Sequence, residues 1–202
     1  MRTHVISKRP EPLDWAQLPV ATIDHLLWTP DVNICATAQI CYDESALYVH
    51  LRAKEEHIRA EHTGLIDEVC EDSCLEFFFS PCPGDNRYFN LEFNPNCSMY
   101  LGLGDGNGTL IRLLPEGGAP FDPKAMRTED GWEITYRVPF SFIRTFFPDF
   151  SAESGKSLRA NFYKCGDETE FPHFGAWKEV AVPEPDFHRP EYFGELTLKR
   201  NR

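Results

Sequence analysis

The chain has 202 residues, of which 42% are apolar and 13% aromatic, and its formal net charge is −12. This length and composition predict a single domain, spanning residues 1–202, with a substantial core. The acidic balance and the lack of any basic run argue against nucleic acid and against an anionic membrane surface as partners, because both attract clustered Lys and Arg. No apolar run approaches the roughly 20 residues that span a bilayer.

Short apolar segments, separated by turns rich in Pro and Gly, follow one another along the chain, which is typical of an all-β domain. In chain order the predicted strands are residues 34–42, 46–53, 73–81, 87–94, 98–104, 109–114, 132–140, 158–165 and 194–198. The stretch EEHIRAEHTGL predicts either a short helix or a long loop. FSFIRTFFPDF has helix-like spacing and predicts one or two helical turns before Pro148.

Apolar and polar residues alternate within these segments, as Leu47, Val49 and Leu51 alternate with Tyr48 and His50. Such period-two patterning predicts antiparallel sheets with one buried and one solvated face. Nine strands of this kind predict two sheets packed face to face, so the expected fold is an all-β, two-sheet antiparallel β-sandwich.

The N-terminal segment lacks the apolar stretch of a secretory signal, so we expect a cytoplasmic protein, or a secreted one if a leader has been removed. Seven cysteines are spread without a regular pattern, whereas a secreted disulfide framework more often has an even number.

The stretch RYFNLEFNPN carries an unusual polar row. Phe89, Leu91 and Phe93 form an apolar face, and the opposite face carries a phenol, amides and a carboxylate. If the strands around residues 76, 90 and 161 share a sheet, their outward side chains form one patch. Its members are Glu76, Tyr88, Asn90, Glu92, Asn94, Arg159, Asn161 and Tyr163. Sugars need this mixture, because planar polar groups bind adjacent hydroxyls and rings cover the C–H face. The alternative is a solvated face laced with ion pairs, such as Arg159 with Glu92.

The motifs DESALYVHLRA, EDSCLEFFFSP, FNLEFNPN, DGWEITYRVPF, LRANFYKCG and FHRPEYFGELTL follow one another in a characteristic order. From about Cys41 to Leu198 the chain resembles the family 9 carbohydrate-binding modules, in the relatives grouped with DOMON-like sandwiches. The resemblance implies a jelly-roll-like sandwich that binds a mono- or disaccharide, or a glycan chain end, without catalysis. It also implies an accessory role to glycoside hydrolases in carbohydrate catabolism.

The resemblance further implies which residues bind the sugar. Glu76 matches the glutamate that ends the family's D-S-x-x-E pattern, and the strand holding Asn90 supplies further polar contacts. Relatives clamp the sugar between two rings, for which we expect Trp177 and, because Val69 and Cys70 stand where the other tryptophan belongs, a substitute ring. Candidates for the substitute are Trp28, Tyr88 and Phe187. The predicted ligand-binding residues are Glu76, Tyr88, Asn90, Glu92, Asn94, Arg159, Asn161, Trp177, Phe187 and His188.

Metal ligands are not assigned by the sequence. The His and Cys residues at 57, 62, 70 and 74 have loose spacing that does not match a zinc motif. By resemblance alone the chain could hold structural Ca²⁺, with loop carboxylates such as Asp43, Glu44 or Asp72 as ligands.

Two alternatives to sugar binding stay open. Glu76 and Glu92 could act as the paired carboxylates of a glycoside hydrolase. The chain could also be an interaction or scaffold domain that has lost the aromatic clamp. Neither the sugar nor the oligomeric state follows from the sequence.

Overall fold

The computed structural model describes residues 1–29, 32–114 and 120–199. The described part contains fourteen strands, one α-helix and short 3-10 turns. The strands are β1 (Thr3–Lys8), β2 (Ala21–Ile23), β3 (His25–Leu27), β4 (Cys35–Tyr42), β5 (Ala46–Lys54), β6 (Cys74–Ser80), β7 (Tyr88–Phe93), β8 (Met99–Gly104), β9 (Leu110–Arg112), β10 (Lys124–Thr128), β11 (Gly131–Pro139), β12 (Ser157–Gly166), β13 (His173–Ala176) and β14 (Gly194–Lys199). The helix α1 spans Phe140–Phe146.

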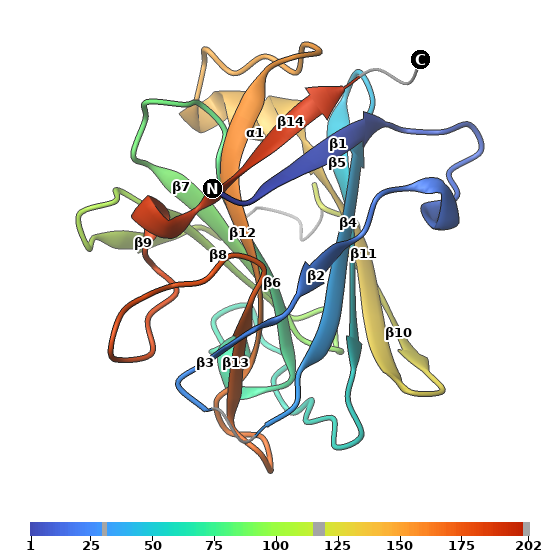
Figure 1. Cartoon of the computed structure of the whole chain (residues 1–202), viewed down its shortest axis with the longest axis vertical. Helices are drawn as coiled ribbons and strands as arrows, with labels where there is room; N and C mark the ends of the chain where they lie inside the picture. The colour runs from blue at the N-terminus through green and yellow to red at the C-terminus, as the bar shows by residue number, and fades with distance from the viewer. Residues whose placement is uncertain (30–31, 115–119, 200–202) are drawn as a thin grey trace.

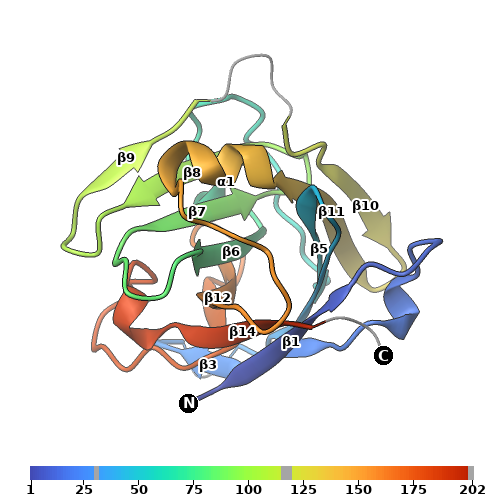
Figure 2. The same ribbon diagram turned by 90° about the horizontal axis from the view of Figure 1, so that it is seen from above.

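The strands form a curled β-sandwich whose two layers face each other (Figures 1 and 2). The hydrogen-bonded order is β10-β11-β5-β4-β1-β14-β12-β6-β7-β8-β9. The predicted sandwich is confirmed, with one difference. The sequence predicted two separate antiparallel sheets, whereas β1, which pairs in parallel with both β4 and β14, joins the two layers by hydrogen bonds.

The main core lies between the layers, where the alternating apolar residues of both halves meet. Phe77 stacks on Phe79 and on Phe162, with ring centroids 4.7 and 5.0 Å apart. Across the core, Val49 and Ile134 are fully buried on the opposite layer. Each such side chain stabilises the fold by roughly 1.5–3 kcal/mol when removed from water.

A second apolar cluster lies on the outer face of the layer formed by β12, β6 and β7. Phe78 and Tyr163 project outward from this layer and meet Val180, Phe187 and Phe193 of the C-terminal segment. Residues 178–193 therefore cover part of the face that the alternation predicted to be solvated. This covering segment is what turns the polar face into a partly enclosed site.

The nine predicted strands are confirmed, with ends that differ by a few residues. FSFIRTF forms α1, whose Phe142 and Phe146 pack against Phe89 at centroid distances of 5.0 and 5.5 Å. EEHIRAEHTGL forms a loop rather than a helix. The strands β1, β2, β3, β10 and β13 were not predicted. Among the described residues, no helix has the length and apolarity to span a bilayer.

Candidate functional site

Four polar side chains form one row across four neighbouring strands. Tyr163 of β12 pairs with Glu76 of β6, which pairs with Glu92 of β7, which pairs with Tyr100 of β8. Directly paired residues project to the same face of a sheet. The neighbouring row runs through Asn161, Phe78 and Asn90. The expected adjacency of the strands around residues 76, 90 and 161 is therefore confirmed.

A hollow of about 310 Å³ lies over this row, and we call it the β6–β7 hollow. Its polar lining comprises Glu68, Glu76, Glu92, Asp167, Asp186 and His188, and its rings are Trp28, Phe78, Tyr100, Phe174 and Phe187. Ligand pockets usually enclose about 300–1,000 Å³, so this one suits a small ligand. None of the described residues that line it is Lys or Arg.

The two central carboxyl groups lie almost entirely out of water. Glu76 is 2% exposed and Glu92 is 6% exposed. The Cys165 thiol donates to Glu76 Oε1 at 2.9 Å, and Asn90 Nδ2 donates to Glu92 Oε1 at 2.7 Å. Glu76 Oε2 is buried and has no hydrogen-bond partner among the described residues.

Burial changes the protonation of this pair. Desolvation raises the pKa of Glu92 to about 7. Desolvation, followed by the nearby Glu92 carboxylate, raises the pKa of Glu76 well above its usual range. Burial therefore favours the protonated form in this pair, and a protonated carboxyl can both donate and accept hydrogen bonds. Sugar hydroxyls need both kinds of partner.

Aromatic rings form one wall of the hollow. Trp28 lies beside Phe174 and Phe187, each at a centroid distance of 5.6 Å. Its indole N–H donates to the Val182 carbonyl at 2.8 Å, which fixes the ring. Elsewhere in the lining, Tyr100 lies under the guanidinium of Arg112, 4.1 Å from the ring centroid. The expected substitute rings Trp28 and Phe187 thus line the hollow.

Four of the predicted ligand-binding residues line the hollow: Glu76, Glu92, Phe187 and His188. Tyr88 and Asn90 lie behind them. The Tyr88 hydroxyl hydrogen-bonds His188 Nδ1 at 2.9 Å, and Asn90 holds Glu92. Tyr88 is 3% exposed, so it braces the site instead of forming its surface.

The other four predicted residues do not line the hollow and make contacts elsewhere. Asn94 closes the end of β7 by bonding Asp72 and the backbone N–H of Ser98. Arg159 donates to the Pro190 carbonyl. Asn161 bonds the backbone of Lys178 in both directions, at 2.8 Å each. Trp177 is buried in the main core against Phe162. Apart from Asn94, these side chains hold the covering segment or the residues that lead into it.

Tyr100 and Phe174 line the hollow but were not predicted. The sequence does contain a signal for Tyr100, because SMYLGLG places it outward on a strand next to β7. Phe174 lies on β13, a strand too short to be recognised from alternation.

A second hollow of about 390 Å³ lies near Glu55, Lys164 and His173. The side chains of Glu55, Lys164 and His173 form ion pairs and hydrogen bonds with one another. Lys164 Nζ lies 3.2 Å from Glu55 Oε1 and 2.7 Å from His173 Nε2, and the Trp132 indole donates to Glu55 Oε2 at 3.0 Å. Because these buried charges are already paired, this hollow offers a ligand fewer free groups than the β6–β7 hollow.

The loop carboxylates considered for calcium do not fit that role. Asp72 accepts from the backbone N–H groups of Glu61 and His62 and from two side chains. Asp43 accepts from Ser45, Ala46 and Tyr48. Glu44 pairs with Lys8. Donors already occupy both oxygens of Asp43 and Asp72 and one oxygen of Glu44, so a Ca²⁺ ion, which takes oxygen ligands, would have to displace them.

The sequence comparison and the structure comparison lead to the same protein family. A sequence model described as carbohydrate-binding family 9 matches residues 7–198. A candidate carbohydrate-binding protein of Bacteroides uniformis is 26% identical, with a TM-score of 0.85 over 98% of this chain and 99% of that chain. No curated protein sequence matches the chain.

Two solved structures of a family 9 carbohydrate-binding module from Caldicellulosiruptor kristjanssonii share the fold. The complex with cellotriose is 12% identical and covers 100% of this chain and 95% of that chain, with a TM-score of 0.71. The complex with glucose is 13% identical and covers 100% and 97%, with a TM-score of 0.71.

Proposed function

Because this chain belongs to carbohydrate-binding family 9, we propose that it binds a mono- or disaccharide, or the end of a glycan chain, in the β6–β7 hollow and catalyses no reaction on it. The observation that carries the proposal is the row of two buried carboxyl groups beside the Trp28 and Phe187 rings. The carboxyl groups supply hydrogen-bond donors and acceptors, and the rings supply an apolar face.

The size of the hollow supports a small ligand. At about 310 Å³ it lies at the lower end of the range for ligand sites. One or two sugar rings suit such a volume better than the middle of a long polysaccharide. Glucose and cellotriose, the ligands of the Caldicellulosiruptor modules, are the first sugars to test.

Hydrolysis is less consistent with the geometry. A glycosidase places its two carboxyl groups on either side of the scissile bond. Glu76 and Glu92 are direct cross-strand neighbours and project the same way from one floor. This arrangement contacts a sugar from one side, as a binding site does. An assay for reducing-sugar release from cello- and xylo-oligosaccharides should therefore show no turnover.

Isothermal titration calorimetry against glucose, cellobiose, cellotriose and xylose tests binding directly. The informative variant is Trp28→Ala, which removes a ring of the hollow. The matched control is Trp15→Ala, since Trp15 packs against His50 away from the hollow. We expect Trp28→Ala to weaken binding at least about tenfold, about 1.4 kcal/mol, and Trp15→Ala to leave it unchanged.

A second variant tests the polar half of the site. Glu92→Ala removes a carboxyl group of the floor and should also abolish or strongly weaken the heat of binding. Circular dichroism of each variant shows whether it is folded. Absence of heat with every sugar, measured on folded native protein, would contradict the proposal. So would equal losses in the Trp28 and Trp15 variants.

A further inference from the structure

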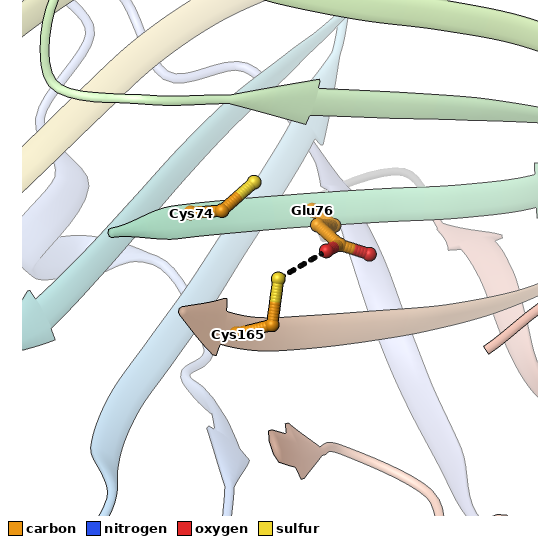
Figure 3. Close-up of side chains that lie close together, drawn as sticks. All are labelled: Cys74, Glu76 and Cys165. Carbon is orange, nitrogen blue, oxygen red and sulfur yellow. Dashed lines mark hydrogen bonds between the residues drawn. The ribbon is translucent and has the colours of Figure 1, made fainter. Parts of the chain in front are cut away.

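Two thiols and a carboxyl group lie close together on β6 and β12 (Figure 3). Cys74 and Glu76 are two residues apart on β6 and so project from the same face. Cys165 of β12 is the direct cross-strand partner of Cys74. One candidate ligand atom from each of the three residues lies within 4.8 Å of the other two.

The cluster is buried and contains no basic side chain. Cys74 is 0% exposed, and Glu76 and Cys165 are 2% exposed each. Glu76 Oε2 has no hydrogen-bond partner among the described residues. Lys164, the residue next to Cys165, is engaged by Glu55 and His173. Burial favours the protonated carboxyl of Glu76, and a bound cation would compensate the charge of the carboxylate that forms when this proton leaves.

The donor set selects the kind of cation. Ca²⁺ and Mg²⁺ take oxygen ligands, whereas thiolates select thiophilic ions such as Zn²⁺. With Zn–S bonds of about 2.3 Å, tetrahedral coordination places two sulfurs about 3.8 Å apart. From separations of at most 4.8 Å, this requires a contraction of at most about 1 Å.

We propose that Cys74, Glu76 and Cys165 bind one thiophilic divalent cation of the Zn²⁺ class. On binding, the two thiols and the Glu76 carboxyl release their protons to solvent, and the two sulfurs and one Glu76 oxygen become ligands. Glu76 and Cys165 also line the hollow, so the fourth coordination position faces it. Three protein ligands with one open position is the arrangement of zinc sites that accept water or a ligand oxygen.

Cobalt titration tests the site. The purified, reduced protein is freed of metal with a chelator and titrated with Co²⁺, which gives an intense sulfur-to-metal absorption band only when thiolates coordinate it. We expect the band to saturate at one equivalent and Zn²⁺ to abolish it. The double variant Cys74→Ser, Cys165→Ser should lose the band, and the control Cys41→Ser, which removes a buried thiol of β4, should keep it.

If the double variant fails to fold, a more conservative variant still tests the proposal. Glu76→Gln keeps both thiols, so it should retain the band but bind Co²⁺ at least tenfold more weakly. Absence of a band in the native protein would overturn the proposal, and so would a band that survives loss of both cysteines or vanishes in Cys41→Ser. A Cys74–Cys165 disulfide that persists under reducing conditions would also overturn it. No sugar is used in this titration, so its outcome is independent of the proposed sugar binding.

Discussion

Replacing Asp72 with asparagine should strongly destabilise the fold. Asp72 lies directly before β6 and is completely buried. Its Oδ2 accepts from the backbone N–H groups of Glu61 and His62, each at 2.9 Å, and from Asn94 Nδ2 at 2.8 Å. Its Oδ1 accepts from the Arg59 guanidinium. Asparagine keeps the shape, but its NH₂ group would face donors instead of accepting from them.

The expected loss follows from these contacts. If the NH₂ group takes the place of Oδ2, buried N–H donors of this loop lose their acceptor; each unsatisfied buried donor costs about 1–3 kcal/mol, so two of them give a loss of about 4 kcal/mol. For a chain of this size, about 4 kcal/mol corresponds to a melting temperature lowered by about 10 °C. Urea unfolding and thermal melting, both followed by circular dichroism, measure the two quantities.

The surface ion pair of Asp85 with Arg87 provides the control, because exposed pairs contribute at most about 1 kcal/mol. Asp85→Asn should therefore change stability by about 1 kcal/mol or less. If Asp72→Asn loses no more than Asp85→Asn, the buried network does not hold the loop before β6 as we describe.

The pH dependence of the free energy of unfolding gives a second test of the role of Asp72. Burial would raise its pKa, but the hydrogen bonds from Glu61, His62, Asn94 and Arg59 together lower it below the usual value. A lowered folded-state pKa contributes stability above the unfolded pKa of about 3.9, and this contribution is lost as the pH falls through the folded value. The stability difference between native protein and Asp72→Asn should accordingly shrink in strong acid.

Three further substitutions have defined outcomes. Burial, followed by the charge of Lys164, lowers the pKa of His173 to about 4. As the pH falls, the unfolded chain therefore binds this proton before the folded protein does, and the free energy of unfolding should fall by about 2 kcal/mol between pH 7 and pH 5. Urea unfolding at both pH values measures this loss, which His173→Gln should not show. Tyr136→Phe removes a buried hydroxyl without a partner among the described residues, and should raise stability by about 1 kcal/mol; a lower melting temperature would show that the hydroxyl is satisfied. Gly102→Ala would place Cβ 2.1 Å from Asn90 Oδ1 and should lower sugar affinity in calorimetry by displacing that amide; unchanged affinity would show that Asn90 does not position the floor.

Alternation along the strands predicted the two faces of the sheet well. Phe89, Leu91 and Phe93 are buried in the main core, as expected, and Glu76 and Glu92 point to the opposite face. This succeeds because strand geometry alone dictates which side chains share a face. The adjacency of β12, β6 and β7 was the condition for one shared polar patch, and the structure fulfils it.

The pattern could not show what covers the outer face. Asn161 was expected to meet a ligand, but it meets the backbone of Lys178, because the chain after β13 folds back over the sheet. Trp177 enters the core where Gly194 leaves room; a Cβ at Gly194 would lie 2.4 Å from the indole. Both outcomes depend on contacts between residues distant in sequence. Periodicity carries no information about such contacts.

The wall and the floor of the β6–β7 hollow come from distant parts of the chain, and contacts join them into one unit. The indole of Trp28 is bound to the Val182 carbonyl, and Phe187 stacks on Tyr163 of β12 with ring centroids 4.0 Å apart. Trp28 also has a backbone φ of +58°, which is disfavoured for a bulky residue and persists only where its surroundings fix it. A ring held in place before binding spares the ligand the entropy of ordering it. The contacts that hold Trp28 and the covering segment in place therefore also fix the Trp28 ring before a ligand binds. A substitution that loosens either part should lower sugar affinity even when it lies outside the hollow.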